Sequence, residues 1–324
     1  MNSLQDAPAR PLAPPRGTST VAVVINPASG GAADDDAELR GAFDALVGDV
    51  LDEPVEWLET TEDDPGTGQA RSAVERGATT VVACGGDGTV RACLEALADT
   101  DTALGVVPLG TGNLLASNLE LPTGDAAPSA AVSGPVRRLD VGTVNGETFA
   151  VMAGSGFDAL MIRDANPATK RRIGSAAYVF SALRNLPVSL VHTTVTVDDR
   201  TVFRGRTAMV LVGNCGAVTG GLEVFPGAQP DDGVLDVAVL TAAGPMQWMS
   251  VFWRLLRGLP QRRNLVARHT GRRIRVETSK PRPYELDGED RPATRELEYT
   301  IRPRALAVHT APADGDGKAA AGNG

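Results

Sequence analysis

The sequence predicts two parts, an N-terminal Rossmann-like α/β domain and a mostly β domain of sandwich type. Two observations predict the first part: short apolar segments alternate with helix-patterned ones, and glycine-rich turns follow several of the apolar segments. That alternation is typical of parallel βαβ units. A third observation predicts the second part, because strand patterns broken by turn signals dominate after about residue 137.

The N-terminal elements follow from apolar spacing. TVAVVIN is β-branched and apolar, as in a strand buried on both faces. Leu39, Phe43 and Leu46 recur at helical spacing, and Gly77 ends a later helix. The expected order is strand 20–26, helix 36–48, strand around 55–58, helix 66–76, strand 80–84 and helix 89–97. ALGVVPLGTGNLLASNL then repeats the pattern of strand, glycine turn and helix.

The second half reads as hairpins and single strands. RLDVGTVNGETFAVMAG predicts a hairpin that turns at Asn145-Gly146. Two further strands flank Asp198-Asp199, and VLDVAVL, RRIRVETS and ELEYTIRP are other strand candidates. Helical patches are expected near residues 168–186 and 245–258.

Composition sets the class of protein. The 324 residues are 42% hydrophobic and 22% charged, which is typical of a globular protein. The three cysteines form no disulfide framework and no metal motif, so a reducing compartment fits best and each is expected to be a small buried apolar group. No apolar run approaches the ~18 residues of a membrane span. We therefore expect a cytoplasmic protein that associates peripherally with a membrane.

Charge is unevenly distributed along the chain. The net charge of -9 argues against nucleic-acid binding. Residues 34–64 hold thirteen acidic residues and one basic residue, whereas residues 254–282 hold ten basic residues and one acidic residue. This asymmetry predicts one face that repels anionic surfaces and one that accepts them, although two solvated surfaces explain it equally well.

Glycine turns give the strongest functional signal. Gly85-Gly86-Asp87-Gly88-Thr89 lies between a predicted strand and a predicted helix. Adjacent glycines let the backbone approach a ligand, and a helix N-terminus directs N–H groups at a phosphate. The motif is neither a P-loop nor a GxGxxG fingerprint.

Two more turns repeat this arrangement. PLGTGN at residues 108–113 again joins a strand to a helix, and NPASGG at residues 26–31 ends the first strand. Open α/β sheets bind ligands at the carboxyl ends of their strands, where such turns meet. Three of them at one edge indicate a nucleotide site.

NPASGG, GGDGTV and PLGTGN, in this order and spacing, resemble the catalytic domain of the diacylglycerol kinase and sphingosine kinase family. The resemblance continues through LDVGTVNG, the DDGVLDV element and YELDGE, and covers residues 21–308. GGDGT alone also occurs in NAD kinases and phosphofructokinases. DDGVLDV and LDGE separate the lipid kinases from both.

The resemblance implies an ATP cleft between the two domains. We place the domains at residues 19–137 and 138–310, with a return of the final strand to the first domain as an open alternative, and expect disordered ends at 1–18 and 311–324. In the family a threonine after the second strand contacts the nucleotide, and of the adjacent Thr60 and Thr61 we favour Thr61 for this role. The implied nucleotide-binding residues are Asn26, Ser29, Gly30, Thr61, Gly86, Asp87, Gly88, Thr89, Gly110, Thr111 and Asn113. Part of the family has aspartate where this chain has Leu114, which shifts metal binding toward Asp87 and Asn113.

The resemblance also assigns the chemistry. Asp287 of LDGE would be the general base, and Glu289 would orient the acceptor or ligate Mg²⁺. A carboxylate of ordinary pKa suffices, because the acceptor proton moves late in a loose transition state. Asp232, and less clearly Asp231, would hold a second Mg²⁺ away from the ATP site. By themselves, both acidic segments also read as polar turns.

The implied activity is ATP-dependent phosphorylation of a membrane-lipid hydroxyl, of diacylglycerol to phosphatidic acid or of a sphingoid-type alcohol. The alternatives are a soluble-substrate kinase such as an NAD kinase, and a catalytically silent lipid-binding regulator. The expected partner is a lipid at an anionic membrane surface. The oligomeric state stays open, a homodimer included.

Two segments suit the lipid side. PMQWMSVFWRLLRG at residues 245–258 is apolar apart from a narrow stripe of Gln247, Ser250, Arg254 and Arg257. Tryptophan beside arginine suits a membrane interface, but a core helix fits most of these residues as well. Lys170, Arg171 and Arg172, in a segment that resembles the family's lipid entrance, are candidates to meet anionic head groups.

Overall fold

The computed structural model describes residues 20–29, 55–156, 190–218, 222–262 and 264–311, with five single positions between residues 37 and 45. The predicted helix 168–186, the basic residues at 170–172 and most of helix 36–48 lie outside the described residues. So do the two chain ends, apart from residue 311.

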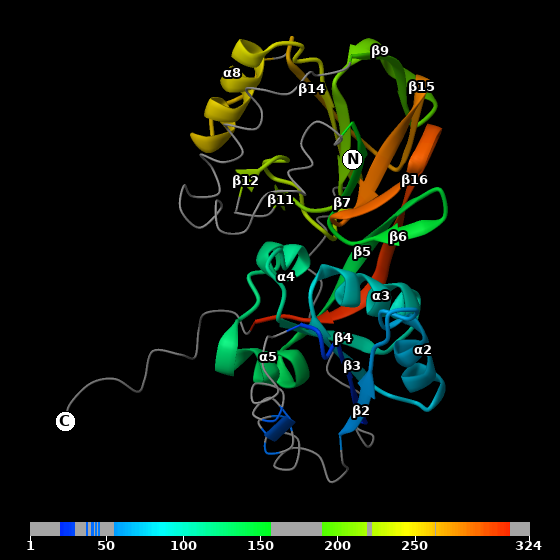
Figure 1. Ribbon diagram of the computed structural model, residues 1–324, viewed down its shortest axis with the longest axis vertical. Helices are drawn as coiled ribbons and strands as arrows, with labels where there is room; N and C mark the ends of the chain where they lie inside the picture. The colour runs from blue at the N-terminus through cyan, green and yellow to red at the C-terminus, as the bar shows by residue number, and fades with distance from the viewer. Residues whose placement is uncertain are drawn as a thin grey trace, which may run out of the picture.

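The N-terminal half is a four-stranded parallel sheet with helices packed on it (Figure 1). Its strands are β1 (Val21–Ile25), β2 (Glu56–Glu59), β3 (Thr80–Gly85) and β4 (Ala103–Pro108), in the spatial order β2-β1-β3-β4. All residues of β1 and β3 are buried, which explains their unbroken apolar and β-branched sequences.

The helices of this half are α2 (Thr67–Glu75), α3 (Asp87–Leu97), α4 (Leu114–Asn118) and α5 (Ala127–Ser133), with a 3-10 turn at Gly124–Ala126. Helix α3 begins two residues earlier than the predicted start at Thr89. The extended backbone of Gly86 (φ −88°) leads directly into it, and this places Asp87 in the first turn, where a carboxylate is favoured by the helix dipole.

The second half consists of antiparallel strands. They are β5 (Val136–Val144), β6 (Glu147–Phe149), β7 (Met152–Ser155), β8 (Val191–Val197), β9 (Arg200–Thr207), β10 (Met209–Gly213), β13 (Leu235–Leu240), β14 (Val266–Gly271), β15 (Arg273–Leu286) and β16 (Glu289–His309). A small separate sheet pairs β11 (Ala217–Val218) with β12 (Leu222–Glu223), and helix α8 spans Pro245–Leu256.

Three tight turns fix the hairpins of this half. Asn145-Gly146, Asp198-Asp199 and Asp287-Gly288 have positive φ at both central residues, as a two-residue hairpin turn requires. The predicted turns at Asn145-Gly146 and around Asp198-Asp199 are confirmed. The third turn joins β15 to β16 and carries the acidic LDGE segment.

Strand β16 connects the two halves. Its first part pairs with β15, its later part pairs with β5, and Ala307 and Val308 lie parallel to Ala103 and Leu104 of β4. The described strands, apart from β11 and β12, therefore form one 14-stranded sheet that runs through both halves (Figure 1). The beginning of β16 is thereby placed over the N-terminal part of α3.

Candidate active site

The site begins at the switch point of the parallel sheet. From β1 the chain crosses to β2 on one side, and β3 then pairs on the other side of β1. The loops that leave β1 and β3 diverge at such a point and open a crevice at their carboxyl ends. The backbone N–H of Asn26 donates to the carbonyl of Cys84 (3.0 Å), so the loop after β1 starts beside the glycine turn after β3.

The two glycine turns after β3 and β4 lie against each other. The N–H of Leu109 donates to the carbonyl of Gly85 (3.0 Å). A Cβ atom on Gly110 would stand 2.6 Å from Cα of Gly86, a distance that real side chains do not tolerate. Glycine at position 110 is therefore required for the backbones to approach this closely.

Asp87 ties this loop pair to α4. Its Oδ1 atom accepts the backbone N–H of Leu114 at 2.6 Å. Leu114, which replaces the aspartate of part of the family, therefore contributes to the site through its main chain. Burial raises the pKa of Asp87, and hydrogen bonds from backbone N–H groups partly oppose that rise.

Asn113 closes the turn after β4. It has a left-handed backbone (φ 47°), its Oδ1 accepts the N–H of Gly110 (3.1 Å), and its Nδ2 donates to the carbonyl of Gly110 (2.7 Å). Its side-chain amide thus holds the shape of the loop. If Asn113 helps to bind a ligand, it would do so by holding the loop backbone in shape.

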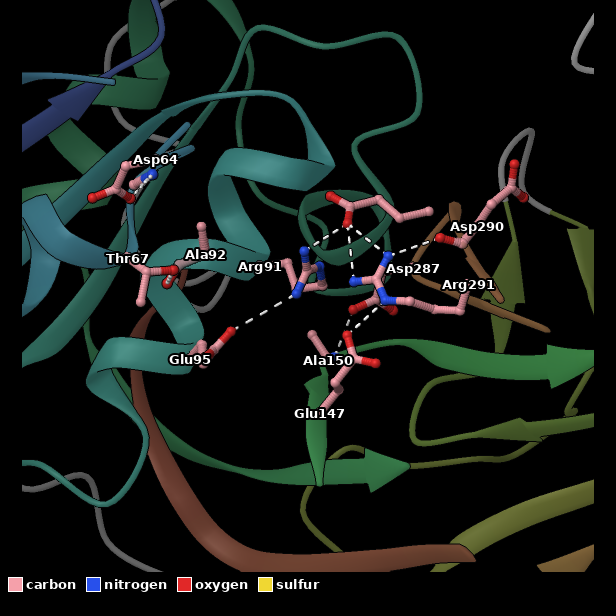
Figure 2. A network of polar contacts seen from close by, with 12 residues as sticks. Asp64, Thr67, Arg91, Ala92, Glu95, Glu147, Ala150, Asp287, Asp290 and Arg291 are labelled. Carbon is pink, nitrogen blue, oxygen red and sulfur yellow. Dashed lines mark hydrogen bonds and ion pairs between the residues drawn. The ribbon is translucent and has the colours of Figure 1, made fainter. Parts of the chain in front are cut away.

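Asp287 reaches the site from the hairpin turn between β15 and β16, and is 6% exposed. Its Oδ1 accepts the N–H groups of Val151 and Met152, both at 2.9 Å. Its Oδ2 accepts the N–H of Ala150 at 2.8 Å, the bond that can be followed in Figure 2. A carboxylate oxygen has two lone pairs, so Oδ1 is saturated and Oδ2 keeps one. Only Oδ2 can take up a proton without losing a bond.

The pKa of Asp287 differs from the ordinary carboxylate value expected from the sequence. Burial raises the pKa of this carboxyl to about 6, the three N–H bonds act against the rise, and the charge of Asp87 adds to it. The carboxylates of Asp87 and Asp287 therefore interact across the boundary between the two halves. Burial also raises the pKa of the nearby Glu285 to about 7, with a smaller contribution from the charge of Asp287.

A pH profile is expected to show this shift. If the Asp287 carboxylate accepts the proton of the acceptor hydroxyl, turnover is lost as pH falls through about 6, since the acid form of Asp287 has no base function. We expect kcat/KM to rise with pH along a limb near 6. Glu285→Gln should keep that limb. A profile that is flat between about pH 5 and about pH 7, one unit either side of the expected limb, would count against Asp287 as the base.

Glu289 links β16 to α3 through an ion-pair network, whose other members Arg91, Arg291 and Glu147 are labelled in Figure 2. Its Oε2 accepts from Nη2 of Arg91 (2.6 Å) and from Nη2 of Arg291 (3.2 Å). Arg291 also donates through Nε to Glu147 of β6 (2.6 Å). Arg91 is only 11% exposed, so this network is shielded from solvent better than surface pairs are.

The other oxygen of Glu289 faces the glycine turn. A Cβ atom on Gly88 would come within 2.9 Å of Glu289 Oε1. The network therefore holds one carboxylate oxygen of the β half beside the N-terminus of α3. This geometry suits a positioning role better than proton abstraction or cation binding, because two guanidinium groups already neutralise the carboxylate.

The remaining predicted residues lie around the same edge. Asn26 Oδ1 accepts the N–H of Ala28 (3.0 Å), and the N–H of Ser29 donates to the carbonyl of Asn26 (2.9 Å). Thr61, after β2, is exposed and accepts the N–H of Asp64 (3.1 Å), whereas Thr60 is buried. Thr89 is buried over Gly85, and Thr111 is exposed at the tip of its loop. Gly30 lies outside the described residues.

The second acidic loop lies next to Asp140. Asp231 is bonded through both oxygens to Arg137 (2.7 and 2.9 Å). Asp232 Oδ1 accepts the N–H of Val234 (3.1 Å), and burial raises the pKa of Asp232. Asp140 accepts the N–H groups of Gly233 and Arg304, both at 2.6 Å. These bonds hold the loop, and the Asp231 carboxylate already has a cationic partner.

The site residues fit a nucleotide with one magnesium ion. The first N–H groups of α3 have no partner within the helix, and a Cβ at Gly86 would meet no side chain within 4 Å, whereas Oε1 of Glu289 lies close to Gly88. Within the described ranges, no group of three or more His, Cys, Asp or Glu side chains is arranged to hold a metal. Mg²⁺ needs no such cage, because it binds through one or two carboxylates with phosphate oxygens and water. Asp87 would supply a carboxylate, whereas Glu289 is already paired with two guanidinium groups.

Sequence reasoning missed three residues of this network: Arg91, Glu147 and Arg291. A signal existed for Arg91, because it follows Asp87 by four positions and therefore shares its face of α3. Neither Glu147 nor Arg291 carries a local signal, because their pairing arises only when β6 and β16 meet.

Family models match both halves of the chain. The diacylglycerol kinase catalytic domain matches residues 20–144, and the YegS C-terminal NAD kinase beta sandwich-like domain matches residues 151–310. These matches confirm the resemblance drawn from the glycine motifs and the predicted fold class.

Relatives of known sequence agree with this. The chain is 33% identical over 241 residues to a protein of Pseudomonas fluorescens named "Probable lipid kinase YegS-like", covering 74% of this chain and 80% of that protein. It is 31% identical over 228 residues to "Diacylglycerol kinase" of Bacillus subtilis, covering 69% and 76%.

Solved structures share the fold. A crystal structure of a diacylglycerol kinase from Bacillus anthracis superposes with a TM-score of 0.75 at 21% identity, covering 91% of this chain and 97% of that one. An NAD kinase from Archaeoglobus fulgidus in complex with ATP gives a TM-score of 0.51 at 14% identity, covering 90% and 94%. The architecture is therefore closer to the first of these structures than to the second.

Proposed function

Because this chain belongs to the diacylglycerol kinase family of YegS-like lipid kinases, we propose that it transfers the γ-phosphoryl group of ATP to a hydroxyl of a membrane lipid. One observation carries the proposal: Asp287 and Glu289 of the β half meet the Gly86 turn and Asp87 of the α/β half at a single boundary. Phosphoryl transfer needs this combination of a phosphate cradle and carboxylates, since its catalysis is positioning and charge stabilisation.

The nucleotide is proposed to lie along the carboxyl ends of β1, β3 and β4. Phosphates would accept N–H bonds from the turn at Gly86 to Gly88 at the start of α3, and the loops at Asn26 and Gly110 would border them. A bound Mg²⁺ would neutralise charge on the phosphates, and the Asp87 carboxylate is the residue best placed to hold it.

Asp287 is proposed as the base toward the acceptor hydroxyl. Its three backbone N–H bonds fix the carboxylate, and the remaining lone pair on Oδ2 gives the proton a defined destination. Glu289 is proposed to position the acceptor, and the alternative role as a Mg²⁺ ligand is disfavoured by Arg91 and Arg291, which hold its side chain. Asp232 remains a candidate ligand for a separate structural Mg²⁺, with Asp231 less suited because of Arg137.

The acceptor is proposed to be diacylglycerol or a sphingoid-type alcohol. The NAD kinase alternative shares the GGDGT turn, but the family match and the closer structural likeness favour a lipid. A silent regulator is disfavoured because the GGDGT and LDGE segments are both intact. No helix among the described residues is long and apolar enough to cross a bilayer.

The test is a transfer assay with γ-labelled ATP and Mg²⁺. Total lipid extract, purified diacylglycerol, a sphingoid base and NAD are offered in parallel, and the products are identified by mass spectrometry. We expect label in a lipid monophosphate and none in NADP. Label in NADP alone, or in no product although the protein binds ATP, would refute the proposed function.

A further inference from the structure

Helix α8 leaves apolar side chains in solvent. Among the described residues, four large hydrophobic side chains are notably exposed, and all of them lie on α8 or in the turn that follows it. They are Met246 (83% exposed), Trp253 (52%), Met249 and Leu259. Exposed apolar groups gathered on one element indicate an interaction surface.

The helix has two apolar faces with different environments. Trp248, Val251 and Phe252 are buried in the large core cluster of the protein and anchor the helix. Met246, Met249 and Trp253 recur at the spacing of one helix face and point away from that core. The core interpretation of this segment holds for the first face, and the interface interpretation stays a prediction for the second. α8 lies at the periphery of the β half in Figure 1, so the outer face is accessible.

The charge around this face is positive. The guanidinium of Arg257 stacks over the ring of Trp253 at 4.2 Å, and Arg254 Nε donates to the carbonyl of Pro260 (2.7 Å). No acidic residue occurs in the sequence between Asp236 and Glu277, although the whole chain carries a net charge of -9. The excess of arginine is therefore a local property of this segment.

We propose that this face of α8, with Leu259, docks the protein on an anionic lipid bilayer. Met246, Met249, Trp253 and Leu259 enter the boundary between head groups and acyl chains, and Arg254, Arg257 and Arg262 meet lipid phosphates. Apolar residues beside tryptophan and arginine form the pattern that an interfacial helix requires. The inference rests on the proposed function, since a lipid kinase must reach a bilayer.

A second copy of this chain fits the face less well. A two-fold interface places the same patch on both partners, so the arginines of one copy would meet those of the other. The segment offers no acidic residue to compensate this repulsion. An anionic bilayer supplies the complementary charge.

Vesicle flotation without ATP tests the proposal. The probes are vesicles of equimolar phosphatidylcholine and phosphatidylglycerol, and the variants are Met246→Ser with Trp253→Ser, and Arg257→Glu. Each is expected to bind about tenfold more weakly than the wild type. Arg71→Glu is the matched control, because it makes the same charge change on an exposed position of α2 and should bind as the wild type does.

Two further measurements test whether the outer face of α8 contacts the bilayer or a second copy of the protein. Tryptophan fluorescence should be quenched by brominated lipid in the wild type and much less in Trp253→Phe. Undiminished vesicle binding by the Met246/Trp253 variant overturns the proposal. So does light scattering that shows a dimer in the wild type and a monomer in that variant. Vesicle binding through α8 without lipid phosphorylation would refute the proposed function alone. Lipid phosphorylation without vesicle binding through α8 would refute this inference alone.

Discussion

Asp287→Asn is expected to lower kcat by a factor of about 1,000 or more while the protein still binds Mg·ATP. The Oδ2 atom of Asp287 holds the lone pair proposed to accept the proton of the lipid hydroxyl, and an amide cannot take that proton. The shape of the side chain is preserved, so the loops that hold the nucleotide should keep their positions.

The same variant is expected to be less stable. The NH₂ group of the introduced amide would face at least one of the backbone N–H groups of Ala150, Val151 and Met152, which all donate to the native carboxylate. Leaving such a buried donor unpaired costs about 1–3 kcal/mol. Assays therefore belong well below the melting temperature of the variant.

Glu285→Gln serves as the control, because Glu285 is a neighbouring titratable group to which no step is assigned. Turnover within about threefold of wild type is expected there, well under the loss that removal of a general base causes. Near-normal turnover by Asp287→Asn, with folding and ATP binding intact, would remove Asp287 from the base role and leave it the structural task of fixing residues 150–152.

Gly86→Ala is expected to weaken Mg·ATP binding by about 2 kcal/mol, or about 30-fold, without loss of stability. The backbone at Gly86 is extended, and a Cβ there would meet only Cα of Gly110 at 3.6 Å, an ordinary contact. The added methyl group would instead occupy space that the phosphates are proposed to fill. Calorimetric titration with Mg·ATP and a thermal melt measure the two effects separately.

Substitutions of two other glycines serve as comparisons for Gly86→Ala. Gly110→Ala should destabilise the protein even without nucleotide, because its Cβ would stand 2.6 Å from Cα of Gly86. Gly244→Ala should change neither property, since nothing lies within 4 Å of a Cβ at that position. Wild-type affinity in Gly86→Ala would mean that the phosphates bind elsewhere.

Local sequence patterns were sufficient for much of the fold. The apolar β-branched runs predicted β1 and β3, and Asn145-Gly146 predicted a tight hairpin, because these signals act within a few residues of the chain. The start of α3 was misplaced by two residues, since Gly86 permits an extended turn that ends immediately before Asp87. The order of the glycine turns along the chain also predicted their common edge of the sheet.

The contacts that shape the site depend on residues far apart in sequence. The carboxylate of Asp287 bonds to residues 150–152, and Glu289 pairs with Arg91, so neither partner lies near in the chain. Such contacts are fixed by the register of β15 against β7 and by the path of β16 to β4. For the same reason, the sequence of α8 left its core and interface interpretations open, and burial in the fold showed that one face packs in the core while the other is exposed.

Hydrogen–deuterium exchange with and without Mg·ATP tests most directly whether a triphosphate binds where the two halves meet. The account predicts slower exchange in peptides that contain Ser29, Gly86, Gly110 and Asp287, with no change in the distant β8–β9 hairpin. Slowing confined to other segments, or no change at saturating Mg·ATP, would contradict it.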